Sequence, residues 1–362
     1  MIIGRTRALR SPGEKIRVLV VDDSVVIRRL VTHALSEDPA VEVVGAASNG
    51  VLALQRIAQT SPDVVTLDIE MPEMDGLETL RHIRRQYPRI RVIMFSTLTE
   101  RGAVATIDAL AAGADDYVSK ASNAGSLDAS LTALRGELVP KIHQFFTEFT
   151  PVATPAPPAV PPPPARWGRP HPQVVAIGVS TGGPTALGEI IPMLPADFPL
   201  PVLIVQHMPP LFTRFLADRL SQQSKLPVEE ATEGAVIAPG RILIAPGDFH
   251  MYAARTAGGI QVHLDKAPPE NSCRPAVDAM FRSVAAVYGA CAVAAILTGM
   301  GQDGLRGAET LKGAGAFIVA QDEASSVVWG MPRAVVEAGL ADAVVDLRHV
   351  VPEILRAVAC CV

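Results

Sequence analysis

A run of prolines near the middle of the chain most constrains how this sequence can fold. Ten of the 22 residues over 151–172 are proline. Because proline has no backbone N–H to donate and a fixed φ angle, a run this dense forms neither a helix nor a sheet. We interpret the run as a semi-rigid linker of polyproline type, and a ligand for an SH3-type domain is the less favoured alternative.

The linker divides the chain into four predicted regions. They are an N-terminal extension over 1–15, a first domain over 16–136, the linker over 137–172 and a second domain over 173–360. The length of 362 residues also supports two domains, since it exceeds what one hydrophobic core usually holds.

Both domains alternate strand-like and helix-like segments. In the first domain, apolar runs of strand length lie at 16–23, 41–48, 63–72, 91–98 and 115–120. In the second domain they lie at 173–180, 201–207, 241–248, 291–299 and 316–322, with an antiparallel strand expected within 258–266. The segments between them have helical patterns. This alternation predicts an α/β fold with two doubly wound parallel sheets, one in each domain.

Composition argues against several classes of protein. The formal net charge of −5 disfavours binding to nucleic acid or to an anionic membrane along the whole sequence. No stretch of about 18 apolar residues is present, so we expect no membrane span. The first residues lack the apolar core of a secretion signal, and no CxxC pair occurs. We expect a cytoplasmic protein with reduced thiols at Cys273, Cys291, Cys360 and Cys361.

Three acids follow predicted strands of the first domain. Asp22 and Asp23 end the first strand, and Asp68 ends the third. The carboxyl ends of parallel strands meet at one sheet edge, so these carboxylates would repel one another unless a divalent cation such as Mg²⁺ binds there. Ser96 and Lys120 end two further strands and could hold a phosphoryl group on Asp68. Helix capping by the acids is the alternative.

The same motifs closely resemble the receiver domain of two-component response regulators. The matching segments are VVDDS at 20–24, LDIEMPEMDG at 67–76, FST at 95–97 and YVSK at 117–120. The resemblance implies a flavodoxin-like fold in which Asp68 accepts a phosphoryl group from a histidine kinase. It also implies that Asp22, Asp23 and Asp68 bind Mg²⁺ with the backbone carbonyl of Glu70.

The receiver resemblance assigns three further roles. Ser96 would be the switch hydroxyl, Tyr117 the switch aromatic residue, and Lys120 the partner of the phosphoryl group. One position departs from the family pattern, because Ala121 stands where a proline usually follows the lysine. The cis peptide bond that this proline normally brings is therefore not expected here.

The second domain begins with a serine between glycines. The segment GVSTG at 178–182 fits G-x-S-x-G, in which a serine nucleophile lies on a turn between a strand and a helix. The chain has an apolar strand before this segment and a helical pattern after it. A glycine turn with a helix-capping serine is the alternative, since the motif alone is weakly specific.

A serine nucleophile needs a base and a group that orients the base. His207 ends the strand after Ser180, and Asp303 follows a later strand, so all three are expected at one sheet edge. Two alternatives stay open on the residues alone. His250 is a rival base, and the set Ser180, Asp303 and His349 has the chain order of α/β-hydrolases.

Several motifs of the second domain resemble the catalytic domain of chemotaxis protein-glutamate methylesterases. They are GVSTGGP at 178–184, VQHMPPLFT at 205–213, APGDFHM at 245–251, RPAVDAMF at 274–281, LTGMGQDG at 297–304 and WGMPRAV at 329–335. The resemblance implies a Rossmann-like serine esterase with Ser180 as nucleophile, His207 as base and Asp303 as its orienter. It also implies an oxyanion hole at the backbone N–H of Met300, with Thr181 nearby.

The two resemblances together predict a phosphorylation-regulated enzyme without a cofactor in its catalytic domain. Its substrates would be glutamate γ-methyl esters, and also glutamines, on methyl-accepting chemotaxis receptors. The unphosphorylated receiver would cover the catalytic face. The alternatives are a receiver linked to a domain that signals by binding alone, and a general serine esterase. A DNA-binding regulator is disfavoured, because the second domain lacks a basic stripe.

Overall fold

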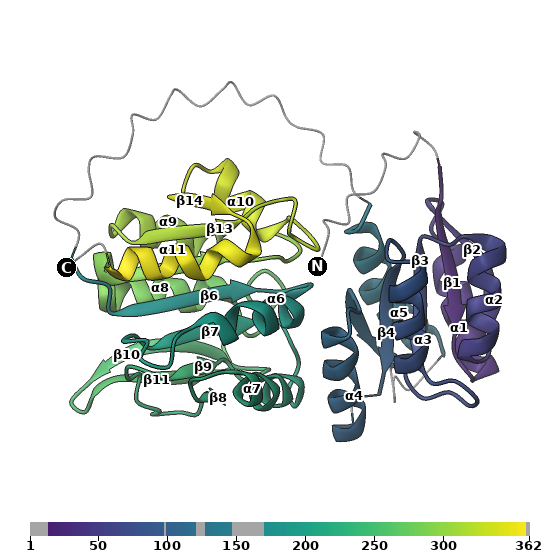
Figure 1. Cartoon of the computed structure of the whole chain (residues 1–362), viewed down its shortest axis with the longest axis horizontal. Helices are drawn as coiled ribbons and strands as arrows, with labels where there is room; N and C mark the ends of the chain where they lie inside the picture. Colours follow the sequence, from purple (N-terminus) through teal and green to yellow (C-terminus); the bar gives the residue numbers. More distant parts are fainter. Residues whose placement is uncertain (1–13, 98, 121–126, 147–169, 360–362) are drawn as a thin grey trace. The chain divides into compact units, whose positions relative to one another are not determined.

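The computed structural model describes residues 14–97, 99–120, 127–146 and 170–359 (Figure 1). The chain forms two compact units, Met1–Thr147 and Glu148–Val362. Ala121, Cys360, Cys361, nearly all of the N-terminal extension and most of the proline-rich run lie outside the described residues. No helix among the described residues has both the length and the apolar character needed to cross a membrane.

The first unit contains a parallel five-stranded sheet. Its strands are β1 (Ile16–Val21), β2 (Val41–Ala47), β3 (Val64–Asp68), β4 (Arg91–Ser96) and β5 (Asp116–Ser119). They are arranged in the order β2-β1-β3-β4-β5, and every neighbouring pair is parallel. This is the strand order of flavodoxin-like folds, so the predicted fold class is confirmed for this unit.

Five helices connect these strands. They are α1 (Val25–Ser36), α2 (Gly50–Thr60), α3 (Gly76–Gln86), α4 (Glu100–Ala111) and α5 (Leu127–His143). The first four begin where a side-chain oxygen accepts a backbone N–H from the first turn, at Ser24, Asn49, Asp75 and Thr99. These residue types are strong N-caps, which explains why each helix starts directly after a strand or a short loop.

Helix α5 corrects the predicted domain boundary. It continues to His143, seven residues beyond the expected end of the first domain at 136. Leu138 and Ile142 are fully buried against the sheet, in the same core cluster as Val20 and Ile93. Sequence patterning placed the start of the linker too early because the burial of this last turn depends on contacts with distant strands.

The second unit contains a parallel seven-stranded sheet in the order β14-β13-β12-β6-β7-β9-β8. Its strands are β6 (Val174–Val179), β7 (Val202–Gln206), β8 (Val228–Glu230), β9 (Ile242–Ile244), β12 (Ala292–Ile296), β13 (Phe317–Gln321) and β14 (Ala343–Val345). The five predicted strands form its centre, while β8 and β14 are short edge strands that the sequence analysis missed. The expected antiparallel strand pairs elsewhere, since β11 (Gly259–Asp265) forms a separate hairpin with β10 (His250–Thr256).

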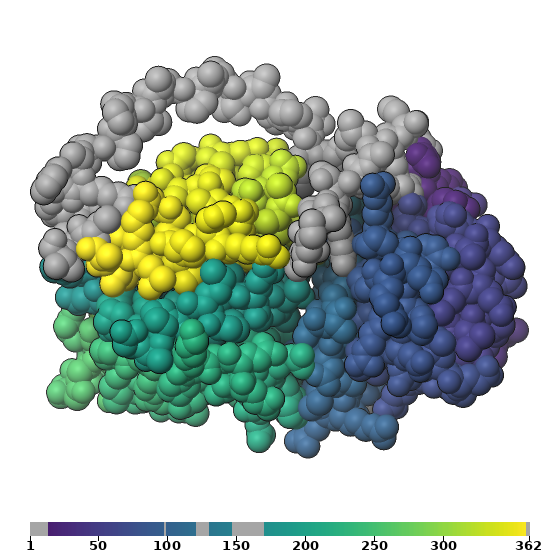
Figure 2. All heavy atoms as spheres, in the orientation of Figure 1, coloured from purple at the N-terminus to yellow at the C-terminus, as the bar shows by residue number. Residues whose placement is uncertain are grey.

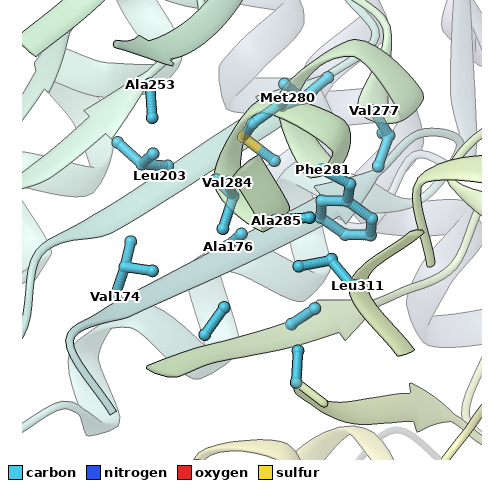
Figure 3. Packing of buried hydrophobic residues seen from close by; sticks show 14 of the residues in the cluster. Val174, Ala176, Leu203, Ala253, Val277, Met280, Phe281, Val284, Ala285 and Leu311 are labelled. Atoms are coloured by element: carbon cyan, nitrogen blue, oxygen red, sulfur yellow. The ribbon is translucent and has the colours of Figure 1, made fainter. Parts of the chain in front are cut away.

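Helices pack against this sheet and build its core. They are α6 (Gly183–Ile190), α7 (Phe212–Gln223), α8 (Val277–Tyr288), α9 (Leu305–Gly313), α10 (Met331–Glu337) and α11 (Leu347–Ala359). Figure 3 shows side chains of α8, including Met280, Phe281 and Val284, packed with Ala176 of β6 and Leu203 of β7. Helix α11 buries Val350 and Ile354, while Arg348, His349 and Arg356 are exposed. The last described residues of the chain, in yellow, lie at the surface of this unit (Figure 2).

The order of this sheet reverses direction between β6 and β12. Strand β6 is the first of the sheet in the sequence, and its neighbours are β7 on one side and β12 on the other. A crevice forms at such a switch point, outside the carboxyl ends of the strands, and ligands bind there in open α/β sheets. The three strands at this point are those that Ser180, His207 and Asp303 follow.

Candidate functional sites

Ser180 occupies the turn between β6 and α6. Its backbone N–H donates to the carbonyl of Thr298 at 3.0 Å, which ties the turn to the loop after β12. Gly182, the N-cap of α6, has a φ of 78°, a conformation that glycine adopts without strain. Gly299 lies so close that an added Cβ would be 2.7 Å from the Cβ of Ser180. The serine is therefore held by close backbone packing on both sides.

His207 lies between Ser180 and Asp303. Its Nδ1 is 3.0 Å from the Oγ of Ser180, and its Nε2 is 2.8 Å from Oδ2 of Asp303. A carboxylate accepts hydrogen bonds and cannot donate them, so Nε2 carries the proton in the neutral imidazole. Nδ1 is then free to accept the hydroxyl proton of Ser180. The arrangement can therefore activate a serine for attack.

Asp303 is held in its charged form. Only 2% of the residue is exposed, and burial alone would raise the pKa of its carboxyl group. Hydrogen bonds from His207 and from the backbone N–H groups of Val277 and Asp278 reverse that effect, so the pKa of Asp303 lies below its usual value. A fixed negative charge next to the imidazole stabilises an imidazolium.

The pKa of His207 is raised by its surroundings. Burial favours the neutral imidazole, but the hydrogen bond to Asp303 outweighs it and raises the pKa above the usual value of 6.5. Cys273 acts in the same direction, and its Sγ lies 3.5 Å from Nδ1. Cys273 is one of the four cysteines expected to be ordinary reduced thiols. Nothing in the local pattern indicated that it lies beside the histidine.

The rival histidines have other partners. His250 is fully buried; its Nδ1 accepts the backbone N–H of Ala276 at 3.2 Å, and its Nε2 lies 3.2 Å from the carbonyl of Pro268. His349 is exposed, and its Nδ1 lies 2.7 Å from a carboxylate oxygen of Asp346. The structure thus places both of these rings in contacts unrelated to Ser180.

The residues expected around the oxyanion lie beside the serine in sequence or in space. Thr181 follows Ser180 directly, and its carbonyl accepts the hydroxyl of Thr298 at 2.9 Å. Met300 follows Gly299, which packs against Ser180, and the residue is 44% exposed. The backbone around both residues is therefore anchored close to the serine.

The acidic residues of the first unit converge as the sequence predicted. Asp22, Asp23 and Asp68 each offer a carboxylate oxygen, and these oxygens lie within 4.8 Å of one another. Nζ of Lys120 is 2.8 Å from Oδ2 of Asp68 and 2.9 Å from Oδ2 of Asp22. Burial, followed by the charge of Asp22, raises the pKa of Asp68 to about 6 although Lys120 opposes the shift.

A pocket of about 210 Å³ opens over this acidic cluster. Glu70, Ser96 and Lys120 line it together with Asp23 and Asp68. Mg²⁺ prefers hard oxygen ligands such as carboxylates, and a bound cation would relieve the repulsion between these acids. The residues present therefore fit this ion. The acids that could hold the ion thus share one pocket with the hydroxyl of Ser96 and the ammonium group of Lys120.

Both expected switch residues, Ser96 and Tyr117, are buried. The hydroxyl of Ser96 donates to the carbonyl of Gly102 at 3.0 Å. Tyr117 is 8% exposed, and Nζ of Lys141 lies 4.9 Å from the centre of its ring. Burial raises the pKa of the Tyr117 hydroxyl well above its usual value, so this side chain is neutral.

The two folds and their sites define a receiver-type domain joined to an α/β domain with a serine–histidine–aspartate arrangement. A family model described as CheB methylesterase matches residues 175–354, and one described as response regulator receiver domain matches residues 18–132. The chain belongs to the CheB methylesterase family.

Individual relatives agree with this assignment. The chain is 51% identical to a protein-glutamate methylesterase/protein-glutamine glutaminase of Nocardioides sp., over 96% of both chains. It is 42% identical to a protein of the same description from Pyrococcus horikoshii, over 96% of this chain and 94% of that protein. It is also similar to the crystal structure of the Thermotoga maritima CheB methylesterase catalytic domain, with 46% identity and a TM-score of 0.50. That match covers 51% of this chain and 97% of the other.

Proposed function

We propose that Ser180, His207 and Asp303 carry out the ester hydrolysis that names this family. The substrates are glutamate γ-methyl esters of methyl-accepting chemotaxis receptors, and receptor glutamines are deamidated by the same chemistry. The reaction takes place in the cytoplasm. The observation that carries the proposal is the continuous contact from the serine hydroxyl through the imidazole to the buried carboxylate, at 3.0 Å and 2.8 Å.

The reaction has two halves. Oγ of Ser180 attacks the ester carbonyl while Nδ1 of His207 takes the hydroxyl proton, and Asp303 stabilises the imidazolium that results. The imidazolium then protonates the departing methoxide, so methanol leaves and an acyl-serine remains. Water deprotonated by His207 attacks this ester, and the proton returns to Oγ as glutamate is released.

The tetrahedral intermediates carry a negative charge on the former carbonyl oxygen. We assign the backbone N–H of Met300 to this oxyanion, with Thr181 beside it. One such donor contributes about 3–4 kcal/mol of transition-state stabilisation. The close packing of Gly299 on Ser180 supports this assignment, because it brings the loop that bears Met300 next to the reacting oxygen.

Replacement of the nucleophile tests the proposal. Ser180→Ala should lower methanol release from methylated receptor membranes by on the order of 10⁴-fold or more. Ser221→Ala is the matched control and should keep its turnover, because Ser221 lies on the exposed side of α7 and its Oγ accepts only a long hydrogen bond from the N–H of Val228, at 3.4 Å. Small chromogenic esters assayed side by side measure the preference for receptor esters. Turnover retained by Ser180→Ala would refute the assignment of the nucleophile.

The first unit provides the regulation in this proposal. Asp68 accepts a phosphoryl group from a histidine kinase, with Lys120 and Ser96 contacting its oxygens. Asp22, Asp23 and the backbone carbonyl of Glu70 would hold Mg²⁺, which neutralises charge during the transfer when it is bound. Phosphorylation then shifts an equilibrium between a less active and a more active state of the enzyme.

A charge-removing variant tests the regulation. Asp68→Asn should reduce the stimulation of hydrolysis by a small phosphodonor to a ratio of about 1, because the acceptor oxygen is lost. Glu78→Gln removes an exposed acid on α3, outside the pocket, and should keep the stimulation. If Asp68→Asn is stimulated as strongly as the unmodified protein, Asp68 is not the regulatory phosphorylation site.

A further inference from the structure

Helices α8 and α9 cap each other. Within the described residues, neither helix has a side-chain cap from its own N-cap position. Asp303 lies just before α9, and its carboxylate accepts the N–H groups of Val277 and Asp278 in the first turn of α8, at 2.6 Å and 3.0 Å. Asp278 in turn accepts the N–H of Gly307 in the first turn of α9, at 2.7 Å. Each helix thus begins on a carboxylate that the other helix or its N-terminal loop supplies.

Asn271 joins the two capping carboxylates. Its Nδ2 lies 3.0 Å from Oδ2 of Asp278 and 2.9 Å from Oδ1 of Asp303. Both partners are carboxylates, which accept hydrogen bonds when ionised, so the amide nitrogen and not the oxygen must face them. Asn271 has a φ of 50°, in the left-handed region that asparagine tolerates better than most residues. Local backbone geometry and side-chain chemistry therefore favour the same residue.

These bonds determine which oxygen of Asp303 faces the imidazole. Oδ1 accepts from Asn271, from the N–H of Asp278 and from the N–H of Gly304 at 2.9 Å. Oδ2 accepts from His207 and from the N–H of Val277. Rotation of the carboxylate away from the histidine would break several of these bonds at once. The orientation is therefore fixed before any substrate binds.

Asn271 also separates two like charges. Asp278 and Asp303 are 1% and 2% exposed, whereas Asn271 itself is exposed and lies on the solvent side of both. Burial, and the charge of Asp303, raise the pKa of Asp278. A donor between two buried carboxylates reduces their repulsion, because it supplies positive partial charge to both.

We propose that Asn271 is a positioning residue for Asp303, and that it acts together with Asp278 to hold Oδ2 of the carboxylate against His207. The predicted effect on turnover rests on the proposed function. The predicted effect on the His207–Asp303 hydrogen bond does not. Asn271 touches neither the serine nor, in this proposal, the substrate, and its role is exerted through Asp303.

The first test uses Asn271→Ala in the full chain. Without the amide, Oδ1 of Asp303 loses one of its three donors and the carboxylate is held less firmly. We expect kcat to fall roughly 10- to 100-fold while KM changes little, since misplacing a catalytic group by about 1 Å has effects of this size. The NMR signal of the Nε2 proton of His207, strongly deshielded by its bond to Asp303, should move upfield. Ser283→Ala is the control, because it removes a side-chain bond from α8 at a distance from both carboxylates.

A double variant separates positioning from folding. In N271D/D278N, the new asparagine at 278 can donate to the new aspartate at 271, so the contact between these two positions is kept. The donor to Asp303 is lost, and a carboxylate faces it instead. We expect kcat to fall at least as far as in Asn271→Ala, with thermal unfolding measured alongside.

Two results would overturn the proposal. One is an unchanged Nε2 proton signal in Asn271→Ala, and the other is turnover at the level of the unmodified protein in N271D/D278N. If the unmodified chain releases no methanol, the proposed function fails, but the NMR comparison still decides whether Asn271 orients Asp303.

Discussion

Both sheets of this protein place a buried carboxylate at the carboxyl ends of their strands, but the two carboxylates have pKa values shifted in opposite directions. Asp68 ends β3, and burial with a neighbouring acid raises its pKa to about 6. Asp303 follows β12 and is buried to a similar extent, but hydrogen bonds from His207 and backbone N–H groups lower its pKa. The topology is shared, so the difference comes from the donors that surround each group.

This difference separates a group that reacts from a group that orients. Asp68 lines an open pocket, and its main cationic partner, Lys120, is a flexible side chain. An added phosphoryl group or metal ion can therefore rearrange the contacts of Asp68. Three of the donors to Asp303 are backbone N–H groups, those of Val277, Asp278 and Gly304. Such a carboxylate is suited to holding one fixed orientation throughout a reaction.

The largest expected effect comes from neutralising Asp303. Asp303→Asn should lower kcat by on the order of 10⁴-fold, because the amide no longer stabilises the imidazolium or selects its tautomer. The charge of Asp303 raises the pKa of His207, so its removal lowers that pKa and moves the acid limb of the kcat/KM profile to lower pH. Kinetics measured as a function of pH check both effects.

The control for this variant is a second aspartate–histidine pair. Asp346→Asn removes the carboxylate that contacts the exposed ring of His349 at 2.7 Å. It should leave the pH profile unchanged. An acid limb that stays in place in Asp303→Asn would contradict the electrostatic role assigned to Asp303.

A smaller effect is expected at the receiver cluster. Mg²⁺ at roughly ten times its dissociation constant should stabilise the first unit by about 1.4 kcal/mol, since it binds the folded state alone. Differential scanning calorimetry with Mg²⁺ or a chelator measures this change. Asp23→Asn should abolish it, and the unfolding of the second unit should not respond. The proposed Mg²⁺ site would be contradicted if Mg²⁺ stabilised the second unit, or if it did not stabilise the first.

The smallest effect is expected at Cys273. Its Sγ contacts the same nitrogen of His207 as Ser180 does, at 3.5 Å. If the thiol takes no part in the reaction, its removal has little effect on turnover. Cys273→Ala should therefore change kcat by less than about threefold. The same receptor-ester assay measures it. A loss of more than tenfold would mean that the thiol takes part in the chemistry.

The sequence predicted the central strands because parallel strands covered on both faces are uninterrupted apolar runs. Every residue of β6 is buried, for example, and its pattern is continuous. The edge strands β8 and β14 have three residues each and include exposed positions, so no such run marks them. The last turn of α5 was missed for a related reason, since its burial is set by tertiary contacts.

The strand pattern also predicted that Ser180, His207 and Asp303 lie at one sheet edge, because all three follow strands of one sheet. The three strands that precede these residues are neighbours in the sheet, so the residues lie close together. The choice of His207 over His250 and His349 came from the family resemblance.

Asn271 and Cys273 belong to the segment between β11 and α8, whose path depends on contacts with other elements. The positions of residues in such a segment cannot be predicted from hydrophobic periodicity. Asp278 lies within the RPAVDAMF motif, but its hydrogen bond with the N–H of Gly307 is visible only in the structure.

The packing of Gly299 against Ser180 limits how this enzyme can diverge. Any larger residue at 299 meets the serine and the sulfur of Met331 at once, within 2.7 Å and 2.5 Å. Descendant sequences could vary freely at the exposed neighbour Met300, whose contribution comes from its main chain. In libraries that randomise this loop, active variants should therefore keep glycine at position 299 and accept nearly every residue at position 300.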